Sequence, residues 1–143
     1  MVDLKRLHHD LVRLETELWN TLEARLRAEH GLPITWFLVM RYVDRHPGRR
    51  IQDIAHEFAI TAGGTSKVVD RIESAGYCRR RPHPRDRRSA IVELTVAGQD
   101  LVGRATEAFE AELHARIGTV VTGQALEQFA ATLRSLLIAS TVR

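Results

Sequence analysis

Seven leucines recur at spacings of three and four residues over the first 26 positions, and this stripe constrains the fold more than any other feature. They are Leu4, Leu7, Leu11, Leu14, Leu18, Leu22 and Leu26. The spacing predicts one amphipathic helix, with Asp3 as its N-cap and an end near Gly31, where glycine can adopt the left-handed C-cap conformation. A helix of about 26 residues is roughly 39 Å long, which is more than one small lobe can cover. We therefore expect the stripe to pack against a partner.

Three shorter helical patterns follow, and only three residues separate the last two. We expect the first to begin with Thr35 as N-cap and to end at residues 46–48, where a proline and a glycine interrupt it. Its core-facing residues are Leu38, Val39, Tyr42 and Val43. The other two patterns cover residues 51–58 and 62–74. Two short helices joined by so tight a turn are typical of a helix-turn-helix, in which the second helix is presented to DNA.

After Gly76 the apolar pattern changes from that of helices to that of strands. Residues 77–82 and 89–94 are expected to pair, and the segment between them contains a proline, three arginines and no apolar residue, which predicts a basic hairpin, or wing. Thr95 is then placed to cap a long helix that ends at Gly118, and Thr122 to start the last one. Because the helices at both chain ends carry apolar stripes that the central lobe cannot wholly cover, we expect a dimer built from both termini.

Positive charge is concentrated in the second helix of the pair and the wing. The chain has a net charge of +3, but residues 67–88 hold eight basic and three acidic residues, which gives +5 and leaves −2 for the remaining 121. Such a concentration suggests a polyanionic partner, either nucleic acid or an acidic membrane surface. Nineteen of the 21 basic residues are arginine, which favours bidentate contacts to phosphate or guanine. Because the cluster lies on a strand and hairpin rather than on an amphipathic helix, we expect no membrane partner.

Composition indicates the class of protein. With 143 residues, of which 44% are hydrophobic and 27% charged, the chain has the composition of a soluble globular protein. Its single cysteine cannot form a disulfide within the chain, no apolar run approaches the length of a membrane span, and no signal-peptide pattern follows the first residues. We therefore expect a cytoplasmic protein. No nucleophile elbow, phosphate loop or dinucleotide fingerprint is present, so we expect neither an enzyme nor a cofactor.

The order of these elements resembles the MarR family of winged helix-turn-helix transcriptional regulators. The most specific part of the resemblance is the succession of VDRIESAGY at residues 69–77, RDRR at 85–88 and LTVAG at 94–98. It implies a mainly α fold with a small β-hairpin wing, in which residues 34–98 form the DNA-binding lobe and residues 1–33 and 99–143 form a helical dimerisation region. The family further implies a homodimer on a pseudo-palindromic operator, usually a repressor released by a small anionic or phenolic effector. The alternative is a non-specific or architectural DNA-binding protein without ligand response.

Candidate DNA-binding residues lie on the second helix of the pair and in the wing. Burial of Val68, Val69 and Ile72 would turn the opposite face of that helix toward the major groove. The resemblance makes Arg88 the residue that enters the minor groove, with Asp86 holding its guanidinium in place. The exposed arginines could instead only keep the hairpin solvated. The full candidate set is Thr61, Ala62, Gly63, Ser66, Lys67, Arg71, Arg85, Asp86, Arg87 and Arg88.

Two local patterns leave alternatives open. The adjacent Gly63 and Gly64 are costly in a helix, so they indicate either close approach to DNA or tight packing beneath a neighbouring helix. In the run of residues 79–81, three arginines must alternate in direction, so the middle side chain faces away from the outer two. One set could contact phosphate while the other braces the wing or pairs with acids such as Asp53 or Glu57.

The resemblance also implies an effector pocket where the first two helices meet the winged lobe and the long fifth helix. Its candidate residues are Trp19, Trp36, Met40 and Arg41. The two tryptophans and the methionine would form apolar walls, and the arginine would anchor a carboxylate or a phenolate. Core packing is the alternative role of each tryptophan.

One cysteine and seven histidines raise the possibility of a sensor. Cys78, beside three arginines, is either a small buried hydrophobe or a thiol whose lowered pKa would let it sense peroxide. No ligand spacing typical of a metal site is present, so we expect no bound metal. His30, His46 and His114 could still converge in the folded chain.

Overall fold

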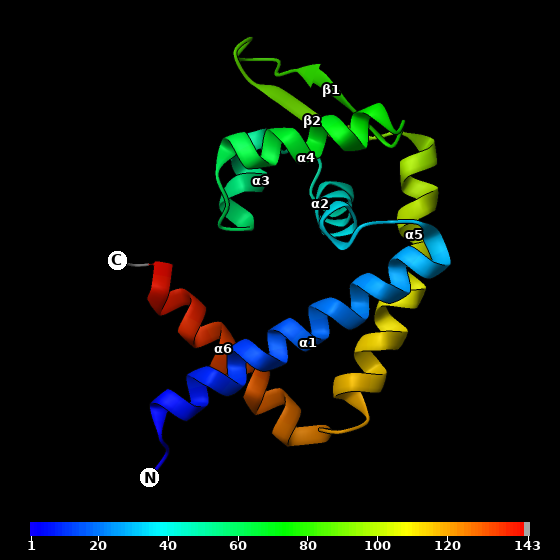
Figure 1. Cartoon of the computed structure of the whole chain (residues 1–143). Coiled ribbons are helices and arrows are strands. Elements are labelled where there is room, and N and C mark those ends of the chain that lie inside the picture. The colour runs from blue at the N-terminus through cyan, green and yellow to red at the C-terminus, as the bar shows by residue number, and fades with distance from the viewer. Residues whose placement is uncertain (142–143) are drawn as a thin grey trace.

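The computed structural model describes residues 1–141 and places a winged helix-turn-helix lobe at one end of the molecule and the helices α1 and α6, from the two ends of the chain, at the other (Figure 1). Its elements are α1 (Leu4–His30), α2 (Ile34–Arg45), α3 (Ile51–Glu57), α4 (Ala62–Ser74), β1 (Cys78–Pro82), β2 (Ala90–Leu94), α5 (Val96–Leu113), the π-helical turn η1 (His114–Gly118) and α6 (Gly123–Thr141). The predicted mainly α fold with a β-hairpin wing is confirmed. The expected dimerisation region runs to residue 143, and its last two residues lie outside the described part.

The long helix α1 has both of its predicted ends. Asp3 Oδ1 accepts hydrogen bonds from the Lys5 and Arg6 N–H groups at 3.0 and 3.4 Å, and Gly31, at φ +60°, caps the C-terminus. The buried residues of α1 are Leu22 and Leu26. The exposed leucines are Leu4, Leu7, Leu11 and Leu14. The helices that pack against α1, chiefly α5 and then α2, therefore cover only the C-terminal part of the leucine stripe.

The start of α2 differs from the prediction that Thr35 is its N-cap. The helix begins at Ile34 with Pro33 in the N-cap position, and Thr35 is its second residue. The Ile34 N–H donates instead to Oε2 of Glu23 on α1, at 2.8 Å. A carboxylate from another helix thus satisfies an N–H group that would otherwise need a local cap.

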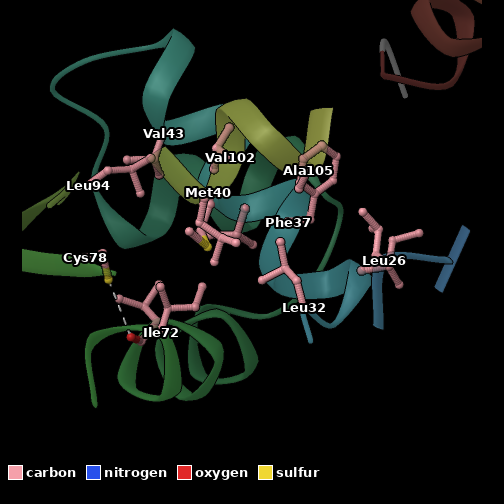
Figure 2. Close-up of a cluster of buried hydrophobic side chains, with 14 of the residues drawn as sticks. Leu26, Leu32, Phe37, Met40, Val43, Ile72, Cys78, Leu94, Val102 and Ala105 are labelled. Atoms are coloured by element: carbon pink, nitrogen blue, oxygen red, sulfur yellow. Dashed lines mark hydrogen bonds between the residues drawn. The ribbon is translucent and has the colours of Figure 1, made fainter. Parts of the chain in front are cut away.

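The core lies around α2 and receives side chains from α1, α4, the wing and α5 (Figure 2). Phe37 and Met40 on α2 are fully buried, and the Phe37 ring centroid lies 4.7 Å from that of Phe109 on α5. Burial of a side chain of this size contributes about 1.5–3 kcal/mol. Met40, which is an expected effector-pocket residue, lies one turn from Phe37 on the face of α2 that packs into the core.

The hairpin β1–β2 is antiparallel and is joined to α5 by one threonine. Cys78 pairs with Leu94 at the base of the hairpin, and the hairpin projects from the opposite end of the molecule to α6 (Figure 1). The Thr95 hydroxyl donates to the Gly76 carbonyl oxygen at 2.7 Å and accepts from the Gly98 N–H at 3.1 Å. Thr95 therefore closes the base of the wing and caps α5.

Helix α6 contains no buried residue between Gly123 and Thr141. Its exposed large apolar residues are Phe129, Leu133, Leu136, Leu137 and Ile138. In residues 1–141 no helix combines the length and the apolar character needed to cross a membrane.

Candidate nucleic-acid interface

The turn between α3 and α4 fixes where the second helix begins. Ala59 has a left-handed backbone, at φ +53°, and the Ile60 N–H donates to the Ala55 carbonyl oxygen at 3.0 Å. Thr61 then caps α4, because its Oγ1 accepts from the Gly64 N–H at 3.0 Å. The predicted helix-turn-helix is thus confirmed, and Thr61, a candidate DNA contact, has a capping role in the chain itself.

Thr65 anchors the buried face of α4, although the sequence analysis did not single it out. It is fully buried, and its Oγ1 donates to the Thr61 carbonyl oxygen at 2.9 Å. It lies four residues before the buried Val69 and seven before the buried Ile72, which puts all three on one face of the helix. That spacing could have predicted the burial of Thr65, but a polar residue is not counted in an apolar pattern.

The opposite face of α4 is open to solvent. Its exposed or half-buried residues are Ala62, Gly63, Ser66, Lys67 and Arg71. Among the described residues, a Cβ atom on Gly63 would meet nothing within 4 Å, and one on Gly64 would meet the Thr61 hydroxyl at 3.1 Å. Packing beneath a neighbouring helix therefore does not explain the two glycines, and close approach of an external partner is the interpretation that stays open.

Arg80 connects the wing to α4. Its Nη1 donates to Glu73 Oε1 at 3.0 Å, and its Nη2 donates to Asp70 Oδ1 at 2.7 Å and to the Ser66 carbonyl oxygen at 3.3 Å. Its backbone N–H also donates to Glu73 Oε2, at 2.9 Å. Because these three residues of α4 are spaced four and three apart, they line one edge of the helix, and Arg80 spans that edge.

Of the alternatives left open for this run of arginines, pairing with Asp53 or Glu57 is not the one that the structure shows. Asp53 accepts from the Arg50 Nε at 3.2 Å, in the first turn of α3. The acids that Arg80 does reach belong to the second helix of the pair, because β1 follows α4 directly and folds back along it. Sequence spacing alone does not predict which acidic residues Arg80 contacts.

Arg79 and Arg81 lie on the other face of the hairpin and share one carboxylate. Their Nε atoms donate to Glu93 Oε1 at 2.7 Å and to Oε2 at 2.9 Å. The hydrogen bonds from Arg81 and Arg79 hold the pKa of Glu93 below its ordinary value. The predicted alternation is confirmed, and the outer pair braces the wing through the neighbouring strand.

The wing tip is held by Asp86, but not in the way that was expected. Its Oδ1 accepts from the Arg88 backbone N–H at 3.0 Å and its Oδ2 from the Ser89 hydroxyl at 3.2 Å. Within residues 1–141 no carboxylate forms an ion pair with Arg85, Arg87 or Arg88. The expectation that Asp86 holds the Arg88 guanidinium is therefore wrong: Asp86 fixes the backbone, and the three guanidinium groups are exposed.

The apolar cavity beside Trp19 is not lined by the other three candidate effector residues. Trp19 borders an apolar cavity of about 170 Å³, whereas Arg41 lies over the Phe109 ring, 5.8 Å from its centroid, and Trp36 packs against the core. The other residues around this cavity are Thr35, Leu38, Val39, Phe58, Ile60 and Val68. None of the lining residues is charged, so the cationic anchor expected from Arg41 is absent from this cavity.

Cys78 is a buried thiol in the core (Figure 2). Its Sγ lies 3.8 Å from the Val69 carbonyl oxygen, to which it donates. Burial, with a smaller contribution from Glu73, raises its pKa to about 11. The lowered pKa needed for peroxide sensing is therefore contradicted. Among the described residues no group of three or more His, Cys, Asp or Glu side chains is placed to hold a metal ion.

Comparison with known proteins connects this geometry to a family. Residues 30–89, which include α2, α3, α4, β1 and the wing tip, match the model of the MarR family. The uncharacterized HTH-type transcriptional regulator YkoM of Bacillus subtilis is 28% identical over 76 residues, which cover 53% of this chain and 49% of YkoM. The chain spans about half the length, or less, of the curated relatives that it matches.

Two solved structures from Streptomyces coelicolor share the fold. The MarR family transcriptional regulator AbsC has a TM-score of 0.89 at 18% identity, over 100% of this chain and 98% of AbsC. Sco3205, a MarR family transcriptional regulator in complex with DNA, has a TM-score of 0.87 at 19% identity, over 96% of this chain and 88% of its own. At these identities the likeness establishes the winged helix fold of the chain.

Proposed function

Through residues 30–89 the chain belongs to the MarR family of winged helix-turn-helix proteins, and on this premise we propose that it is a transcriptional regulator that binds specific sequences of double-stranded DNA in the cytoplasm. The observation that carries the proposal is the wing tip, where Asp86 holds the backbone of a turn that exposes Arg85, Arg87 and Arg88. Exposed guanidinium groups on a narrow hairpin suit a DNA minor groove, where negative potential is concentrated.

The open face of α4 supports a second contact, in the adjacent major groove. Its side chains are short except for Lys67 and Arg71, and Gly63 offers bare backbone. Thr61 and Ser66 carry hydroxyls that can donate to a phosphate or a base edge. We therefore expect much of the sequence preference to come from groove shape and from the wing rather than from base contacts of α4.

A homodimer would give this lobe its spacing on DNA. Helix α6 and the N-terminal half of α1 expose apolar stripes that the rest of residues 1–141 leaves uncovered, and residues 1–33 and 99–143 are the dimerisation region that we propose. Two-fold symmetry would place two copies of α4 in successive major grooves, about 34 Å apart. The expected operator is then a pseudo-palindrome, and repression follows where such a site overlaps a promoter.

DNA selection from a random duplex library tests this proposal with the full chain. We expect a two-fold symmetric motif that is bound roughly 10³-fold or more tightly than mixed-sequence duplex of equal length. Equal affinity for all duplexes would indicate the architectural alternative, and no binding to either duplex at low salt would reject both.

The cavity beside Trp19 is the effector site that we propose. Its single hydroxyl, on Thr35, and its otherwise apolar lining favour a phenol over a carboxylate, because an unpaired buried carboxylate costs several kcal/mol. In a Trp36→Phe variant Trp19 is the sole tryptophan, so its fluorescence reports on the cavity. We expect phenol to change that fluorescence and to weaken DNA binding, and benzoate at equal concentration to do neither. If benzoate had both effects and phenol had neither, the effector site would lie outside this cavity.

A further inference from the structure

Helix α4 carries two acidic side chains in a place where the proposed function requires approach to a polyanion. They are Asp70 and Glu73, and their side chains are 61% and 40% exposed. A carboxylate beside a phosphate repels it, and Lys67 and Arg71 only bring the net charge of α4 to zero, which leaves the helix with no attraction for a polyanion. Some group outside the helix must therefore compensate these acids if α4 is to enter a groove.

Arg80 is that group in the structure. It is the middle arginine of β1, its side chain is only 23% exposed, and its guanidinium lies within hydrogen-bond distance of Asp70, at 2.7 Å, and of Glu73, at 3.0 Å. The same guanidinium reaches the Ser66 carbonyl oxygen, one turn nearer the start of α4. A guanidinium that bridges two carboxylates through separate nitrogens is fixed in orientation as well as in charge.

The two neighbouring arginines differ from Arg80 in every one of these respects. Arg79 and Arg81 share Glu93 on the opposite face of the hairpin. Within residues 1–141 neither side chain forms a hydrogen bond with α4. Their side chains are 70% and 47% exposed. Three adjacent arginines of one strand thus have two separate roles, and only the middle one is tied to the helix that faces DNA.

Resting on the proposed function, we propose that Arg80 is a positioning residue for DNA binding, which offsets part of the charge of Asp70 and Glu73 and locks α4 against the wing. Its guanidinium contacts the protein and not the DNA. The wing tip and the open face of α4 then reach adjacent grooves as one rigid unit. Loss of Arg80 would release both carboxylates toward the phosphates and would loosen the helix relative to the hairpin.

The test compares Arg80→Gln with Arg79→Gln, which removes the same charge from the same strand. Binding is measured by fluorescence anisotropy on a labelled duplex that carries the motif recovered by selection with the wild-type chain. We expect Arg80→Gln to weaken binding about tenfold or more, and Arg79→Gln by less than about threefold. Equal losses would mean that each arginine acts as a simple cation and would overturn the proposal.

A second step separates charge compensation from a direct phosphate contact. Adding Asp70→Asn to Arg80→Gln restores the local charge, and we expect it to recover most of the lost affinity. Adding Asp100→Asn on α5 gives the same net charge and should recover little, because Asp100 is paired with Arg104 and not with Arg80. Equal recovery by both variants, or recovery by neither, overturns the proposal.

If Arg80→Gln does not fold, as shown by the loss of a cooperative melting transition, a variant that keeps the positive charge tests the proposal instead. Arg80→Lys can compensate one carboxylate but not two, so we expect an intermediate loss that Asp70→Asn repairs. No loss in Arg80→Lys, or a loss that Asp70→Asn leaves unchanged, counts against the positioning role. A wild-type chain that binds no duplex would instead reject the proposed function on which this inference rests.

Discussion

Gly98, in the first turn of α5, lies so close to Tyr77 that a Cβ atom on the glycine would be 2.0 Å from the Tyr77 carbonyl oxygen. The contact lies at the junction where the wing leaves α4 and enters α5. The Thr95 N–H donates to the same carbonyl oxygen at 3.0 Å. Because the obstructing atom belongs to the backbone, it cannot move aside as a side chain can.

The first prediction follows from this contact. Gly98→Ala should lower the free energy of unfolding by about 3 kcal/mol, since the added methyl group must displace backbone at the base of the wing. Urea unfolding followed by circular dichroism measures the change. Gly103→Ala, in the same helix but with nothing within 4 Å of its Cβ position, is the matched control, and we expect it to raise stability by about 0.5–1 kcal/mol. Similar values for the two variants would contradict the close contact.

This junction also explains why part of the fold was predictable from sequence. Leucine periodicity, the short α3–α4 turn and the position of Thr95 are local patterns, and the structure has each element where they placed it. The LTVAG segment has a plain physical reason: its threonine closes the wing and caps α5, and its glycine admits the Tyr77 backbone. Local signals of this kind are contained within a few residues.

Three of the contacts that sequence analysis missed join residues from different elements. Glu23 caps α2 from α1, Arg80 reaches α4 from β1, and Arg41 turns to Phe109 on α5. No spacing rule predicts such pairs, because their geometry depends on how helices pack. Asp86 is a different case, because the contact is local. Its carboxylate accepts from the Arg88 backbone N–H and the Ser89 hydroxyl, and not from the Arg88 guanidinium.

The second prediction concerns the wing tip. Arg88→Ala should weaken binding of the selected duplex about 10–100-fold, the cost of losing a guanidinium from a groove. The dimer and the melting temperature should not change, because the Arg88 side chain is exposed at the tip. Arg104→Ala on α5 is the control, with an exposed arginine paired to Asp100, and should bind as the wild type does. Unchanged affinity of Arg88→Ala at fixed salt would remove the wing from the mechanism.

The third prediction uses the buried thiol. Because burial raises the pKa of Cys78 from 9.0 to about 11, the thiolate fraction at pH 8 is about 100-fold lower than in the unfolded chain. Iodoacetamide should therefore label the native protein about 100-fold more slowly than the protein in urea, as measured by mass spectrometry. The neutral thiol favours the folded state, so stability should fall as the pH rises from 9.0 to about 11. In Cys78→Ala that pH dependence should diminish. Rapid labelling of the native thiol would restore the peroxide-sensor hypothesis.

The last prediction concerns the uncovered face of α6. Leu133→Glu places a charge at the centre of a stripe formed with Phe129, Leu136 and Leu137, all exposed in the single chain. If a second copy covers this stripe, the buried and unpaired carboxylate should convert the dimer into a monomer at micromolar concentration, which sedimentation velocity detects. Ser135→Glu introduces the same charge on the opposite face of α6 and should leave the dimer intact. The monomer should retain its winged lobe, since α6 has no buried residue, but should lose preference for symmetric sites. An unchanged dimer in Leu133→Glu would place the interface on another surface.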